Sequence, residues 1–173
     1  MSQIVEFYRG TKPDYLGRRL QEIWQWDNDH LEYSHNYIQV LFPNRESSEF
    51  NANAPLLDPV TIDAFLHDEQ LRKNLATSLQ RMLRFYGLEY KEESGKVVKG
   101  PDFSERAGDW ITPHNHNFLR ITRILKCLVD LGLLDSARAF IECLNEIYSE
   151  FAADIGPETI AYWRRALIDR SGV

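Results

Sequence analysis

Apolar residues recur at helical spacing along most of this 173-residue chain. The longest stripes lie in three C-terminal segments, roughly His114–Leu131, Asp135–Tyr148 and Pro157–Leu167, which glycines separate. Side chains three and four residues apart share one face of a helix, so each segment predicts an amphipathic helix with one buried side. Little of the chain alternates as an extended strand would. The pattern therefore predicts an all-α fold.

Helix-starting and helix-stopping residues mark two further helices near the N-terminus. Asp14 suits an N-cap position and predicts a first helix that runs through Trp24. A second helix is predicted to follow Asp29, which resembles a capping box together with Glu32. It ends at Phe42, because the proline that follows disfavours a helical conformation at the residue before it.

The middle of the chain predicts a loop, two helices and a hairpin. The polar stretch from Pro43 to Pro55 is rich in turn-forming residues and predicts an ordered surface loop. A short helix follows Asp58, and a longer one ends at Gly87, a residue suited to the turn after a helix. Residues 88–91 and 96–99 flank a Ser-Gly turn, which predicts a small exposed β-hairpin outside the helical core.

Length and composition indicate one compact domain over residues 1–173. The chain is 43% hydrophobic, enough for a substantial core, and its formal net charge is -6. Contacts to a nucleic-acid backbone need clustered lysine and arginine, so this acidic balance argues against a nucleic-acid partner. The oligomeric state stays open at this point.

Cysteine usage and hydropathy bear on the compartment. Cys127 and Cys143 lie within apolar helical patterns and have neither metal-ligand spacing nor the density of a disulfide-stapled secreted domain. The first ten residues lack the apolar core of a signal peptide, and no apolar run is long enough to cross a bilayer. We therefore expect a cytoplasmic protein whose membrane association is at most peripheral.

The stretch from Pro113 to Lys126 is the most informative part of the sequence. His114, His116, Arg120 and Arg123 gather at the start of a predicted helix, where free backbone N–H groups and the helix dipole favour an anion. These side chains can hold a phosphate or a carboxylate. The alternative is that His116 and the arginines pair with carboxylates of this acidic chain.

A second polar group lies in the predicted Asp29–Phe42 helix. His35 lies on an apolar stripe with Leu31, Ile38 and Phe42, and Gln39 lies on a second stripe with Glu32 and Asn36, so little of this helix simply faces solvent. If it is mostly buried, these side chains need partners, since an unpaired buried polar group costs roughly 1 to 3 kcal/mol. His35 is thus either a hydrogen-bonded core histidine or a member of a site. The candidate ligand-binding residues are His35, Gln39, His114, His116, Arg120 and Arg123.

Signatures of metal binding and catalysis are weak. Glu32 and His35 have the spacing used in helical di-iron sites, but the second Glu-x-x-His of such bundles is missing, so we predict no metal and no cofactor. The sequence also lacks a phosphate-cradling glycine loop, a Gly-x-Ser-x-Gly elbow and a His-Glu-x-x-His helix. These absences leave enzymatic activity uncertain and favour a noncatalytic role.

Ordered motifs from Phe7 to about Leu144 resemble the conserved N-terminal domain of the opioid growth factor receptor family. They are Phe7-Tyr8-Arg9, Leu31-Glu32-Tyr33, His35, Tyr37-Ile38-Gln39, Leu41-Phe42-Pro43, Arg45-Glu46, Met82-Leu83, Phe85-Tyr86-Gly87, His116 to Lys126, and Leu131-Gly132. Val40 stands where the family pattern has tryptophan. The resemblance implies a mostly helical domain that binds an enkephalin-type opioid peptide, in a receptor at nuclear or internal membranes. It supplies no catalytic residues.

Two hypotheses follow for the function. The first is a noncatalytic binding or interaction domain whose pocket, between the Tyr37-Ile38-Gln39 helix and the His116 helix, takes a peptide or a small anion. The alternative is an enzyme acting on a phosphorylated substrate, with His35 and His116 as acid and base and with Arg120 and Arg123 as the phosphate clamp. The enzyme hypothesis requires both histidines to face one cleft.

Overall fold

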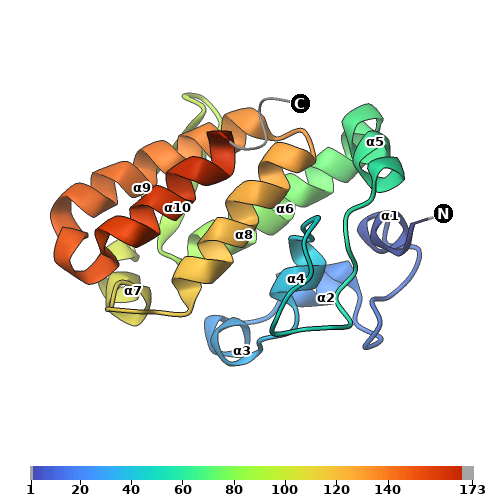
Figure 1. Ribbon diagram of the computed structural model, residues 1–173, viewed down its shortest axis with the longest axis horizontal. Helices are drawn as coiled ribbons and strands as arrows, with labels where there is room; N and C mark the ends of the chain where they lie inside the picture. Colours follow the sequence, from blue (N-terminus) through green and yellow to red (C-terminus); the bar gives the residue numbers. More distant parts are fainter. Residues whose placement is uncertain (1, 169–173) are drawn as a thin grey trace.

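The computed structural model describes residues 2–168, which form ten helices and one two-stranded sheet (Figure 1). The all-α prediction is confirmed. The elements are α1 (Gln3–Tyr8), α2 (Leu20–Trp24), α3 (Asn28–Tyr33), α4 (Ile38–Leu41), α5 (Pro59–His67), α6 (Glu69–Phe85), β1 (Leu88–Lys91), β2 (Lys96–Lys99), α7 (Phe103–Trp110), α8 (Asn117–Asp130), α9 (Leu134–Ile155) and α10 (Pro157–Ile168).

The three predicted C-terminal helices, α8, α9 and α10, pack against one another in one half of the molecule (Figure 1). The fully buried Trp163 of α10 meets Phe118 of α8 edge to face, and its indole Nε1–H donates to the Phe118 carbonyl at 3.1 Å. Such a buried aromatic pair with its polar atom satisfied stabilises the contact between the two helices. α8 is therefore held rigidly along its buried side.

Helix α6 packs against the N-terminal helices α1, α2 and α5 and against β1 of the hairpin, whose other strand packs on α9. Its buried Ser78 links these helices, because its hydroxyl accepts a hydrogen bond from the Trp24 indole at 2.8 Å and donates to the Tyr8 hydroxyl oxygen, 3.1 Å away. The Tyr8 hydroxyl donates its own proton to the carbonyl of Leu41, which ties α1 to α4. Helix α1 was not predicted from the sequence.

The predicted hairpin is confirmed, with Leu88 paired to Lys99 and Lys91 to Lys96 in antiparallel register. Gly87 ends α6 in the left-handed conformation, at a φ of 77°. Helix α7, a second element that the sequence did not predict, starts so close to this turn that a Cβ on Gly87 would lie 2.7 Å from the Phe103 Cα.

The predictions for the first two N-terminal helices were wrong in their extents. Asp14 does not cap a helix; its carboxylate accepts from the backbone N–H groups of Leu16 and Arg18 in a turn, and α2 starts only at Leu20. The predicted second helix is two short helices, α3 and α4, separated by residues 34–37. Asp27, rather than Asp29, caps α3 by accepting from the His30 N–H.

Candidate functional site

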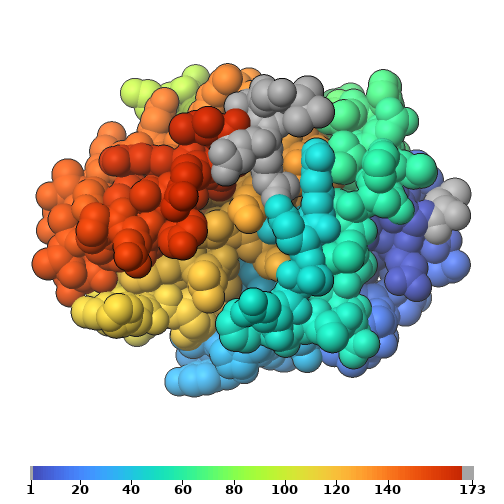
Figure 2. Space-filling model, in the orientation of Figure 1, coloured from blue at the N-terminus to red at the C-terminus, as the bar shows by residue number. Residues whose placement is uncertain are grey.

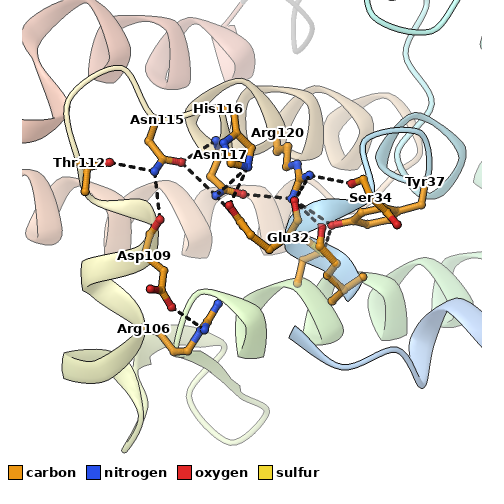
Figure 3. Close-up of polar contacts among 12 residues, drawn as sticks. Glu32, Ser34, Tyr37, Arg106, Asp109, Thr112, Asn115, His116, Asn117 and Arg120 are labelled. Atoms are coloured by element: carbon orange, nitrogen blue, oxygen red, sulfur yellow. Dashed lines mark hydrogen bonds and ion pairs between the residues drawn. The ribbon is translucent and has the colours of Figure 1, made fainter. Parts of the chain in front are cut away.

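The break between α3 and α4 is held open by Arg120, which reaches across from α8 (Figure 3). Its guanidinium donates to the backbone carbonyls of Leu31 at 3.0 Å, Glu32 at 3.2 Å and Ser34 at 2.9 Å. In a continuous helix these carbonyls would accept from N–H groups four residues later. Arg120 takes the place of those donors and turns the chain toward α8.

Both terminal nitrogens of the Arg120 guanidinium are used by the protein. Its Nη1 also lies within 3.3 Å of the Tyr37 hydroxyl and the Asn117 side-chain oxygen, and the residue is only 5% exposed. All five acceptors are uncharged. The positive charge is therefore held by dipoles, not by a direct ion pair, and its field extends into the surroundings.

A polar cluster at the start of α8 connects Arg120 to the surface (Figure 3). The Glu32 carboxylate contacts His116 Nε2 at 2.9 Å and accepts from the Asn117 amide at 3.2 Å. The side chain of Asn115 caps the helix by accepting from the Asn117 N–H at 2.9 Å, and the Phe118 N–H donates to the Asn115 carbonyl at 3.0 Å. Two N–H groups of the first turn are thus already occupied, which corrects the expectation of a free anion-binding helix end.

His116 is neutral near pH 7. Partial burial lowers its pKa below the usual 6.5, Arg120 and His35 lower the pKa further, and the Glu32 carboxylate opposes them. Because a carboxylate can only accept, the neutral ring places its proton on Nε2 and donates to Glu32. The contact is therefore a hydrogen bond that orients the imidazole, rather than an ion pair.

An open cleft of about 550 Å³ lies between α4, the segment 44–50 and the outer side of α8. Figure 2 shows this segment, in cyan, on the surface beside the orange side chains of α8. The cleft is lined by His35 and Gln39, by Asn44 and residues 47–50, by His116 just before α8, and by Leu119, Arg120, Thr122, Arg123 and Lys126 of α8. Its volume is in the range of small-ligand sites.

Three cations line the cleft, Arg120, Arg123 and Lys126, against one carboxylate, that of Glu49. Arg123 donates through Nη1 to the Phe42 carbonyl at 3.1 Å, and Lys126 lies 3.9 Å from the Glu46 carboxylate. The cleft is therefore cationic in a chain whose formal net charge is -6. A cleft lined by one sign of charge concentrates ligands of the opposite sign.

The structure places most of the predicted site residues around this cleft. His35 and His116 come together with ring centroids 5.7 Å apart, edge to face. His35 is exposed, so the alternative of a core histidine was wrong; the break after α3 turns its side chain out of the core. Gln39 and Arg123 also line the cleft, but the exposed His114 does not, because a left-handed φ of 61° places it in the preceding turn.

Two predicted roles change with this geometry. Arg120 was expected to clamp a phosphate, yet its donors are taken by the backbone of α3 and by Tyr37 and Asn117. Pairing with a carboxylate was expected for His116 and the two arginines; the structure places His116 against Glu32, whereas the guanidinium of Arg123 donates to the Phe42 carbonyl. Among residues 2–168, no group of three or more histidine, cysteine, aspartate or glutamate side chains is arranged to hold a metal ion.

Sequence reasoning missed the contribution of the segment after Pro43 and of Lys126. The segment was read as a surface loop without assigned residues, although Asn44 and Phe50 line the cleft. Asn44 is buried and its amide donates to the Arg123 carbonyl at 3.1 Å, which fixes the segment against α8. For Lys126, the signal was its position three residues after Arg123, on the same helix face.

The model of the family described as "Opioid growth factor receptor (OGFr) conserved region" matches residues 5–167. The chain belongs to the opioid growth factor receptor family. The resemblance seen in the motifs is thereby confirmed. Within residues 2–168 of this family member, no helix has both the length and the apolar character needed to cross a membrane.

Several curated relatives share this opioid growth factor receptor region. Opioid growth factor receptor-like protein 1 of Xenopus tropicalis is 39% identical over 124 residues, covering 70% of this chain and 23% of that protein. The opioid growth factor receptor of Mus musculus is 40% identical over 120 residues, covering 69% and 19%. The human receptor is 36% identical over 111 residues, covering 64% and 16%. The match thus spans about a fifth of the relatives' length. No solved structure matches the chain.

Proposed function

We propose that this chain is a noncatalytic binding domain and that the cleft between α4 and α8 takes the anionic group of a peptide or small ligand. The observation that carries the proposal is the gathering of Gln39, Arg123 and Lys126 around one open, cationic cleft of about 550 Å³. The relatives named receptors support a binding role over a catalytic one.

Electrostatics support an anion in particular. Arg120, in the wall of the cleft, holds its charge on neutral acceptors, and Arg123 and Lys126 bring two more positive charges to the cleft. A ligand carboxylate or phosphate entering here gains from all three charges, and its main competitor is the Glu46 carboxylate, 3.9 Å from Lys126. The wall is also rigid, since Arg120 and the buried Asn44 fasten its two sides to α8.

Thermal unfolding in the presence of candidate ligands tests the proposal. The probes are inorganic phosphate, acetate, citrate and a pool of N-acetylated tetrapeptides with free carboxyl ends. Ligand at 100 times its Kd stabilises the native state by about 2.7 kcal/mol, which raises the Tm by roughly 5 to 10 °C. We expect at least one probe to raise the Tm of the wild type, and the Arg123→Gln, Lys126→Gln double variant to lose the shift.

The matched control is the Arg84→Gln, Arg164→Gln double variant, which removes the same charge from exposed positions outside the cleft. This control should keep the ligand-induced shift. The proposal fails if no probe raises the Tm, or if the cleft variant and the control respond alike.

One observation favours a second candidate, a phosphoester hydrolase. Neutral His116 is oriented by Glu32 at 2.9 Å and faces His35, which fits a general base next to a general acid. Arg123 alone would then hold the phosphate, because Arg120 is occupied. Hydrolysis of p-nitrophenyl phosphate by the wild type, lost in His116→Gln, would support this candidate; no turnover above a heat-denatured control would remove it.

Cys127 and Cys143 are buried and not joined to each other by a disulfide, which supports a reducing compartment such as the cytosol. The acidic overall charge supports the absence of a nucleic-acid partner. Fractionation of cells producing the tagged chain, with a binding assay on duplex DNA at low salt, tests both assignments. Enrichment on membranes or micromolar DNA binding would contradict them.

A further inference from the structure

Gln39 carries a buried hydrogen-bond acceptor that the described residues leave unpaired. The residue is 4% exposed, it lines the cleft, and its side-chain oxygen has no hydrogen-bond partner among the described residues. Its neighbours Ile38, Val40 and Leu41 are buried in the core, so the backbone that carries it is fixed. A buried acceptor without a donor costs roughly 1 to 3 kcal/mol, and a ligand N–H that reached it would remove that penalty.

Arg123 and Lys126 offer N–H donors and positive charge, which require an anionic acceptor from the ligand. Only one hydrogen bond, from Nη1 to the Phe42 carbonyl, is formed between the Arg123 guanidinium and the described residues, which leaves other N–H groups for a ligand. Lys126 lies three residues further along α8, on the same face of the helix. The two side chains together suit a planar carboxylate, which Arg can bind through two parallel hydrogen bonds.

The rim of the cleft is apolar. Phe50 from the segment after α4 is 77% exposed, and Leu119 from the first turn of α8 is 62% exposed. Both side chains line the cleft, one on each side of it. Large exposed apolar groups next to a polar recess are typical of a surface that binds a ligand with an apolar part.

We propose that the cleft recognises the C-terminus of a peptide that ends in an apolar residue. The terminal carboxylate binds Arg123 and Lys126, the last peptide N–H donates to Gln39, and the last side chain packs between Phe50 and Leu119. This inference rests on the proposed binding function and specifies its ligand.

Other anions meet these three requirements less well. A phosphate monoester dianion supplies negative charge but no N–H for Gln39. A free amino acid supplies an ammonium group in place of the peptide N–H, which adds a positive charge beside Arg123 and Lys126. The peptide terminus combines an anion, a neutral N–H donor and an apolar side chain within one residue.

Fluorescence anisotropy with N-terminally fluorescein-labelled tetrapeptides tests the assignment. The probes are randomised at the first three positions and end in leucine or phenylalanine, as free acids, as C-terminal amides, or as acids methylated on the last peptide nitrogen. We expect the amides to bind the wild type at least 10-fold more weakly than the acids. Methylation should weaken binding about 5-fold or more in the wild type and less than 2-fold in Gln39→Leu.

Variants at the cleft separate this inference from the broader proposal. Arg123→Gln and Lys126→Gln should each weaken binding of the acid peptides about 10-fold, while Arg84→Gln leaves that binding unchanged. If Arg123→Gln does not fold, Lys126→Gln still provides the test. C-terminal recognition is overturned if the acid and amide peptides bind with the same affinity, or if methylation weakens binding to Gln39→Leu as much as to the wild type. If the cleft binds phosphate or citrate but no acid peptide, the proposed function stands and this inference fails. If neither binds, both fail.

Discussion

Replacing Arg120 with methionine should destabilise the fold more than any other single arginine change at the site. The substitution removes five hydrogen bonds and leaves the carbonyls of Leu31, Glu32 and Ser34 without the donor that satisfies them. Methionine fills much of the same volume, so the loss is mainly polar. Because the carbonyls belong to the break between α3 and α4, that turn should loosen first.

The magnitude follows from the number of groups left unpaired. Each of the three carbonyls costs about 1 kcal/mol or more if it stays buried without a donor, and hydrogen bonds from a charged donor contribute about 1.5 to 3 kcal/mol each. These terms are not additive, so we expect a loss of roughly 3 to 5 kcal/mol, as for other broken buried charge networks. Arg120→Lys retains the charge but has fewer N–H donors, so its free energy of unfolding should lie between those of the wild type and Arg120→Met.

Urea unfolding monitored by tryptophan fluorescence measures this loss as the free energy of unfolding in water. Arg123→Met is the matched control, because it removes one hydrogen bond and should cost about 1 kcal/mol. A second readout is the pKa of His116, which Arg120 holds down and which should rise in Arg120→Met. The reasoning is refuted if Arg120→Met costs less than 1 kcal/mol, or no more than Arg123→Met.

Three further predictions concern pH, a turn and a helix cap. Because the pKa of His116 is lowered in the folded state, the unfolded chain binds this proton more tightly, and His116 should make stability fall as pH drops below 6.5. Thermal melts of the wild type and His116→Gln at pH 5 to 8 measure this effect, and a Tm difference that does not change with pH would contradict the prediction. Gly87→Ala should cost about 2 to 3 kcal/mol in urea unfolding, because of its positive φ and the 2.7 Å approach of Phe103; a neutral result would mean that α7 can move away. Asn115→Ala should cost about 1 kcal/mol or more in the same assay, because it removes the α8 cap and the amide bonds to Asp109 and Thr112. Asn115→Asp keeps the cap and loses only the amide bonds, so it should cost less; equal losses would argue against capping.

Long, strongly periodic segments could be predicted from the sequence, and short ones could not. Helices α8, α9 and α10 have enough turns for an apolar stripe to stand out. Helix α1 has six residues, too few for stability alone, and it forms because Tyr8 and its neighbours pack into the core. Helix α7 has eight residues and depends on contacts such as that of Arg106 Nε–H with the Phe85 carbonyl at 2.8 Å.

The break between α3 and α4 shows a different limit. Residues 28–42 have a helical pattern, and nothing local predicts an interruption after Tyr33. The donors that make the interruption stable come from Arg120, almost ninety positions away, so only the tertiary structure reveals them. The same contact explains why His35 is exposed. The general place of the cleft, between the Gln39 and His116 helices, could nevertheless be predicted from the polar residues on each.

The most direct test of the proposed cleft is a two-dimensional nitrogen–proton NMR titration of the labelled chain with the leucine-ending acid peptides and, separately, with inorganic phosphate. The account predicts saturable shifts in the Gln39 side-chain amide and the Arg123 Nε–H with the peptides, while the Arg84 Nε–H stays unchanged. Phosphate should move Arg123 and leave the Gln39 amide less affected. Shifts confined to residues outside the cleft, or none up to millimolar peptide and phosphate, would contradict the account.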